Sequence, residues 1–274
     1  MFATIDAYLD ESGIHGNAKV CMIAGYWGGP GQMRRLDRAW RDALAKFGFP
    51  MKDFHAKDLI KKRDARSMLE ALARVAGEQR KVYPVAYGIV VDDFNSFSLD
   101  ERRFMTGATL MQKSAKLVTS GCPSKPYFAP FQNILKIVTD AAPVGGKAHF
   151  YFGLGRSFAE YARVMFKQIK EDEPIKKAVS TWRSRDRLGD ARFPLAEETA
   201  PLQAADLLVH SLYIHMQERI AKGESGDFTK SPTGLARLCV ANAFSGSDLV
   251  YQNKECLQKM IDQAKSLCPT WIVA

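Results

Sequence analysis

Two adjacent acidic residues near the start of the chain are its sharpest chemical feature. Asp10 and Glu11 lie in the segment YLDESG at residues 8–13, which follows residues rich in β-formers. α/β folds keep their sites at strand ends. Burying unpaired carboxylates costs several kcal/mol, so they need hydrogen bonds, cationic partners or a metal. The pair fits an acidic site, but Asp, Ser and Gly are also favoured in ordinary turns, and spacing alone leaves both interpretations open.

A third acid lies late in the chain, within a helix predicted for residues 201 to about 221. Asp206 is four residues after Leu202 and three before Val209, so it points along the apolar stripe of that helix. An acid on a buried helix face is costly, so it binds either a metal or a nearby backbone group or arginine. We expect Asp10 and Asp206 to come close enough to share one divalent cation or one bridging cationic side chain, because buried like charges raise each other's pKa.

The elements that must position these acids form a pattern of strands and helices. Segments 3–10 and 19–27 are typical of a β-hairpin, and further strands are expected at 84–93 and 147–153. Apolar residues at three- and four-residue steps predict helices. These helices are expected at about 33–47, 65–79, 101–119, 128–141, 157–170, 201–221, 234–244 and 254–266. The predicted order, in which strands come first and helices then alternate with further strands, favours an α/β fold with a mixed sheet and helices on its faces.

Length and composition fit one large domain over residues 1–274. Hydrophobic residues make up 46% of the 274 residues, enough for a sizeable core. We expect a mainly helical insertion at about 100–142 and a helical C-terminal end at about 232–274. Residues 171–192 are charged and irregular, which is typical of an exposed loop or a strand with a mobile flank.

The net charge and the cysteines indicate which partners and which cellular compartment to expect. The formal net charge of +9 attracts polyanions, so nucleic acid is a plausible partner. The five cysteines lie far apart, which favours buried free thiols in a reducing compartment. The start lacks the pattern of a signal peptide, and no run approaches the roughly 18 apolar residues of a membrane helix. We therefore expect a cytoplasmic protein with no membrane partner.

Four short motifs together resemble one known family. They are YLDESG at residues 8–13, the helix from Trp40 to Leu44, the segment FHAKDL at residues 54–59, and PLQAADLL at residues 201–208. In their order and spacing, from about residue 5 to residue 215, they resemble the uncharacterised bacterial and phage-associated family called domain of unknown function 3800. The resemblance implies a ribonuclease H-like fold, whose first strand supplies an aspartate and whose late helix supplies another acid.

The resemblance also implies roles for individual residues. Asp10 and Glu11 match the strand-end acids and Asp206 matches the helix acid, which makes these three the expected catalytic residues. His55 and Asp58 match a segment of unclear role and are additional candidates. The expected cofactor is Mg²⁺ or Mn²⁺, because clustered oxygen ligands hold these ions, which activate a water and stabilise the leaving oxygen of a phosphodiester.

One position departs from the pattern of that family. Similar proteins tend to carry an aspartate where the middle strand ends, in a pattern like FDxG, whereas this chain has FGLG at residues 152–155. Glu197 or Glu198, just before the helix of Asp206, could supply the missing oxygen. The expected metal ligands are therefore Asp10, Asp206 and Glu198, with Glu197 as a further candidate.

The leading functional hypothesis is a metal-dependent phosphodiesterase, a nuclease that cuts nucleic acid through clustered carboxylates. Arg183, Arg185 and Arg187 are expected to bind nucleic acid on the Asp10 side of the sheet, because phosphates approaching acids need nearby cations. The alternative is a catalytically inactive ribonuclease H-like protein that binds nucleic acid or serves a defence or mobile-element module. Salt-sensitive binding without metal-dependent turnover would distinguish this alternative.

Overall fold

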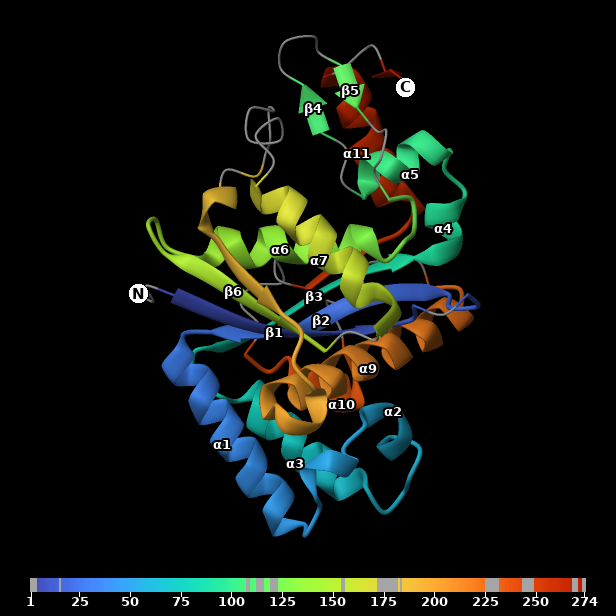
Figure 1. The fold of residues 1–274 in the computed structure, drawn as a ribbon. Coiled ribbons are helices and arrows are strands. Elements are labelled where there is room, and N and C mark those ends of the chain that lie inside the picture. Colours follow the sequence, from blue (N-terminus) through green and yellow to red (C-terminus); the bar gives the residue numbers. More distant parts are fainter. Residues whose placement is uncertain are drawn as a thin grey trace.

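The chain folds around a mixed sheet that is covered by helices on both faces (Figure 1). This computed structural model describes residues 4–14, 16–106, 109–111, 116–118, 123–153, 156–171, 182, 184–224, 232–242, 249–267 and 271–272. The main sheet contains β1 (Thr4–Ser12), β2 (Val20–Gly28), β3 (Val82–Val90), β6 (Lys147–Phe152), β7 (Leu188–Arg192) and β8 (Leu249–Gln252). Its strand order is β7-β6-β1-β2-β3-β8.

The middle of the sheet is an antiparallel unit of three strands. β2 pairs antiparallel with both β1 and β3, so Asp10 lies opposite Ala24. β6 pairs in parallel with β1 and places Tyr151 opposite Tyr8. β7 and β8 extend the two edges, parallel to β6 and β3 respectively. The carboxyl ends of β1 and β6 therefore lie at the same end of the sheet, where Gly153 donates its N–H to the Leu9 carbonyl at 2.9 Å.

Helices form one layer on each face of the sheet (Figure 1). One face carries α1 (Pro30–Lys46), α3 (Arg66–Gly77), α9 (Ala200–Ala221) and α10 (Gly234–Cys239). The other face carries α6 (Phe128–Ala141), α7 (Arg156–Glu171) and α11 (Lys254–Leu267). The shorter helices are η1 (Met51–Asp53), α2 (Ala56–Leu59), α4 (Val91–Asn95), α5 (Leu99–Met105), η2 (Arg185–Arg187) and η3 (Ala196–Glu198).

The alternation of β1 divides its side chains between two cores. Ile5, Ala7 and Leu9 are fully buried and pack in the core under α6 and α7. Tyr8 packs in the opposite direction, against the core under α1 and α9. Because successive side chains of a strand point to opposite faces, Asp10 faces the α9 layer and Glu11 faces the α6 layer.

α1 and α9 are the two helices that enclose the Asp10 side of the sheet. Each has a proline in its first turn, where the missing N–H needs no helical partner. Most of α9 is buried, since it packs on β1 and β2 and contacts both α1 and α10. The helices predicted at 33–47 and 201–221 thus match α1 and α9 closely.

Secondary structure differs from the prediction in three segments. The sequence predicts one helix over 101–119, but α5 ends at Met105, where the Thr106 hydroxyl bonds the carbonyls of Arg102 and Arg103. The strands β4 (Thr109–Met111) and β5 (Lys116–Val118) follow as an antiparallel pair, and β5 also pairs in parallel with β9 (Trp271–Ile272). The strand predicted over 84–93 ends at Val90. The C-terminal end, expected to be helical, also supplies β8 to the main sheet.

The described cysteines are free thiols. Cys21 and Cys239 are buried and Cys256 is exposed, whereas Cys122 and Cys268 lie outside the described residues. Within the described part of the chain, no helix combines the length and the apolar character that crossing a membrane requires.

Candidate functional site

Two acids from distant parts of the sequence meet where β1 ends beneath α9. Asp10 is partly buried, and its Oδ1 accepts the N–H of Glu11 at 3.0 Å. Burial, together with the nearby carboxylates of Glu11 and Asp206, raises the pKa of Asp10 well above its ordinary value of 3.8. The structure therefore brings Asp10 and Asp206 together, and it leaves the Asp10 carboxyl poorly solvated.

Asp206 is held in place by the segment that precedes α2. Its Oδ2 accepts the backbone N–H of Ala56 at 2.8 Å and lies 3.3 Å from Nδ1 of His55. The Asp206 side chain is 14% exposed, whereas that of His55 is 60% exposed. The hydrogen bond to Asp206 raises the pKa of His55. His55 thus joins a partly buried acid to solvent, and Asp58 is exposed three residues further on.

The four motifs that carry the family resemblance converge on this place. Trp40 packs edge-on against Phe54, with ring centroids 5.4 Å apart. The Trp40 indole donates to Oε1 of Gln203 at 3.1 Å, and Nε2 of Gln203 donates to the Met51 carbonyl at 2.8 Å. These contacts fix α1, η1 and α9 relative to one another, and through them the position of Asp206.

Glu11 does not belong to the same cluster of side chains. It follows Asp10 directly in β1, so its side chain points to the opposite face of the sheet. Cys21 and Tyr127 belong to the core under α6 on that face. Their own burial raises their pKa values most, and the negative charge of Glu11 raises them further. The side chain of Glu11 therefore lies on the other face of the sheet from Asp206, and its expected catalytic role stays a prediction.

Gly153 occupies the position expected for the missing middle-strand acid. A Cβ added to Gly153 would lie 3.0 Å from Oδ1 of Asp10, and Asp10 atoms are its three nearest neighbours. The end of β6 therefore lies within side-chain reach of Asp10. The chain has no carboxylate there, so the acids on this face form a pair.

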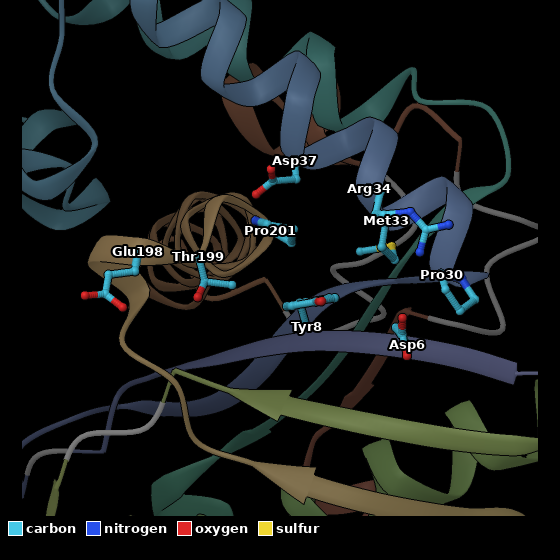
Figure 2. Close-up of a pocket in the computed structure, with 9 residues that line it drawn as sticks. All are labelled: Asp6, Tyr8, Pro30, Met33, Arg34, Asp37, Glu198, Thr199 and Pro201. Atoms are coloured by element: carbon cyan, nitrogen blue, oxygen red, sulfur yellow. The ribbon is translucent and has the colours of Figure 1, made fainter.

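Glu198 lies in a different pocket from Asp10. This pocket has a volume of about 240 Å³, and Asp6 and Tyr8 of β1 line it together with Arg34 of α1. Figure 2 shows Glu198 at the start of α9, in the turn that leads to Pro201. Glu198 and Glu197 are both exposed. Glu198 is expected as a ligand beside Asp10, but the structure places it at the rim of the Asp6 pocket, which Asp10 does not line.

Two of the arginines expected to bind nucleic acid, Arg185 and Arg187, do not lie on the Asp10 side. Arg185 is buried, and its Nε donates to the Ile169 carbonyl in α7; Nη1 of Arg187 donates to the carbonyl of Ala142, which ends α6. Both helices cover the face opposite α9 (Figure 1). The expected location is wrong for Arg185 and Arg187, because both side chains satisfy backbone carbonyls at helix ends. Arg183 lies outside the described residues.

Basic residues of the α2 segment lie near the acids instead. His210 follows Asp206 by one turn of α9, and burial lowers its pKa. Among the smaller influences on His210 are the charges of Lys57 and Lys61, which places both lysines on this side of the molecule. The sequence feature that could have predicted this is the run of basic residues that follows His55 in HAKDLIKKR, residues 55–63.

The donor set suits a cation that keeps part of its water shell. Among the described residues, no group of three or more His, Cys, Asp or Glu side chains is arranged to hold a metal ion. Asp10 and Asp206 supply two carboxylates, and no Lys or Arg of the described chain forms an ion pair with either. Mg²⁺ is commonly held by one or two carboxylates, with waters and substrate phosphates completing its shell. The pair fits that mode of binding, while an all-protein cage is not formed.

Comparisons with known protein families, with curated proteins and with solved structures found no match. The geometry of the site therefore carries the functional argument.

Proposed function

We propose that this protein is a metal-dependent phosphodiesterase that acts on nucleic acid, with Asp10 and Asp206 at its centre. The observation that carries the proposal is the meeting of these two acids, partly buried and without a Lys or Arg partner among the described residues, beside the exposed His55. Such a pair is costly without a cation. A cation that binds between Asp10 and Asp206 during function would offset this cost and explain why the fold keeps two acids together.

We further propose a ribonuclease H-like architecture of the kind that the resemblance to domain of unknown function 3800 implies. Its support is the strand order, in which the antiparallel unit β1-β2-β3 is extended by β6 and β7, both parallel to β1. An aspartate ends the first strand and a second acid lies on a late helix, α9. The placement of Asp10 and Asp206 follows this scheme, and Gly153 is the departure from it.

Asp10 and Asp206 are the residues that would hold Mg²⁺ or Mn²⁺. When bound, such an ion polarises a phosphodiester and lowers the pKa of a coordinated water. Asp206 keeps its orientation through the N–H of Ala56. His55, whose Nδ1 is bonded to Asp206, has the other ring nitrogen, Nε2, to donate a proton to the leaving oxygen. Its raised pKa keeps more of that proton in place near neutral pH.

The test is cleavage of 5′-labelled single-stranded and duplex DNA and RNA, with Mg²⁺, with Mn²⁺ and with a chelator. Asp10→Asn and Asp206→Asn should each lower the rate at least about 100-fold, because each removes a charged cation ligand. Asp186→Asn is the matched control, since Asp186 is exposed in η2, away from the site. Its rate should equal that of the unaltered protein.

Two results would overturn the proposal. One is cleavage by Asp10→Asn at the rate of the unaltered protein. The other is the absence of metal-dependent cleavage of every substrate by the unaltered protein, which would favour the inactive ribonuclease H-like alternative.

A further inference from the structure

The segment from His55 to Arg63 is fixed beside Asp206 by buried anchors. His55 and Ala56 both bond Oδ2 of Asp206, as described above. The side chains of Ala56 and Leu59 are buried in the core that α9 shares with α1 and α3. The charged residues between and after these anchors therefore emerge next to the site.

The backbone of this segment places two lysines on the same side. The Ile60 N–H donates to the Ala56 carbonyl and the Lys62 N–H to the Leu59 carbonyl, both at 2.9 Å. Lys57 lies in α2, and these two bonds close the turn that carries Lys61 directly after it. The influence of both on His210 agrees with this placement on the α9 side.

Four cations of this segment have no acidic partner. All are exposed, and none forms an ion pair within the described residues. They are Lys57, Lys61, Lys62 and Arg63. By contrast, Arg41 pairs with Asp37 and Arg66 with Glu70, each four residues away in its own helix. Like charges gathered without partners repel one another, so this cluster is suited to a polyanion.

We propose that Lys57, Lys61, Lys62 and Arg63 bind the sugar–phosphate backbone of a nucleic acid and guide it to the Asp10–Asp206 pair. The inference rests on the proposed function and names the surface through which its substrate binds. Acids that must accept a phosphodiester repel it, and flanking cations offset that repulsion. Four cations within seven residues, in α2 and the turn after it, match several phosphates of a chain, which a single small phosphate would not require.

The experiment measures binding of fluorescent duplex and single-stranded 20-mers by anisotropy, over a range of salt concentrations and in a chelator, so that cleavage plays no part. Binding of a polyanion releases counterions, and log Kobs falls with log salt in proportion to the number of phosphate contacts. For the Lys57→Gln/Lys61→Gln variant, the slope should become shallower by about 1.8 for duplex and about 1.4 for single-stranded oligonucleotide. Lys259→Gln/Lys265→Gln on α11 is the control with the same change in net charge.

Several results would overturn the inference. They are equal slopes for the α2 and α11 variants, no binding by the unaltered protein, or tighter binding of poly-aspartate than of either oligonucleotide. The last would assign the cluster to an acidic protein. Failure of the proposed function can be told apart from failure of this inference. If the Lys57→Gln/Lys61→Gln variant shows the shallower slope but the unaltered protein shows no metal-dependent cleavage, the phosphate-binding surface stands and only the catalytic proposal fails. A near-native circular dichroism spectrum for both variants ensures that the comparison concerns the surface.

Discussion

Asp10 is the residue whose environment departs most from what its side chain prefers. Its carboxyl lies under α9 with two other acids near it, and within the described part of the chain its oxygens accept a hydrogen bond only from the neighbouring Glu11 N–H. The folded protein therefore favours the protonated form more than the unfolded chain does. This is a local cost that the unfolded chain does not have.

Replacing Asp10 by Asn should raise the free energy of unfolding at pH 7. The pKa of Asp10 is higher in the folded than in the unfolded protein, so between these two pKa values the folded state holds a proton that the unfolded state releases. The contribution of Asp10 to the free energy of unfolding therefore falls as the pH rises from about 4, the unfolded pKa, toward the folded pKa. Each unit of that difference corresponds to about 1.4 kcal/mol, so we expect a gain of at least about 1 kcal/mol. Urea denaturation at pH 4 and pH 7 should show the larger gain at pH 7, with Asp186→Asn unchanged. A less stable Asp10→Asn protein at pH 7 contradicts this account.

Gly153→Asp should restore a third carboxylate to the site. Its Cβ would lie 3.0 Å from Oδ1 of Asp10, so the new acid falls directly beside the pair and Asp10 must shift by a few tenths of an ångström. Without metal the added like charge should lower the melting temperature. With Mn²⁺, affinity should tighten on the order of tenfold, because it rises with the number of charged ligands.

Calorimetric titration with Mn²⁺ measures this difference directly. Gly153→Asn is the control, since it adds the same bulk without the charge. If Gly153→Asp bound Mn²⁺ no better than the asparagine variant, the end of β6 would not be part of a cation site.

Among the secondary-structure elements, α9 depends on one buried amide for its position over β1. Gln203 is 1% exposed and links Trp40 of α1 to the Met51 carbonyl of η1. A helix that packs through apolar side chains alone could slide along the sheet, because apolar contacts have little directionality. The amide fixes its register, and with it the distance between Asp206 and the end of β1.

Gln203→Leu should destabilise the protein by about 1–3 kcal/mol, since the fully buried Trp40 indole N–H would lose its acceptor. The double variant Trp40→Phe/Gln203→Leu should lose less than the sum of the single changes, because it removes both members of the hydrogen bond. Denaturant melts of the three variants measure this. Strict additivity would show that the hydrogen bond does not couple α1 to α9.

The helices of the α9 layer follow from their apolar periodicity, but several other elements do not. β8 pairs with β3, more than 150 residues earlier, and nothing in the four residues Leu249–Gln252 specifies that partner. The short strand β9 depends on a similarly distant pairing, with β5. The opposite directions of Asp10 and Glu11, by contrast, follow from strand alternation alone and were predictable. The structural role of Arg185 and Arg187 was not, because it depends on where α6 and α7 end.

At the scale of the whole molecule, the sheet separates two cores that share no helix. One holds Ala7 and Leu9 of β1 beneath α6 and α7, and the other holds Met22 and Tyr26 of β2 beneath α9. The proposed site lies where the second core opens at the carboxyl end of β1. Both faces of the same strands thus contribute to stability, and only the α9 face carries the proposed site.

This arrangement has a consequence for biosynthesis. β1 and β2 are made first, but α9, which covers their inner face, is about 200 residues further along the chain. At ordinary rates of translation that delay is about 10–40 s, during which Met22, Ala24 and Tyr26 have no α9 to cover them. The nascent chain must keep this apolar face from pairing with other chains, and the two acids meet only once α9 has left the ribosome. The protein acquires its first two strands early and its proposed chemistry late.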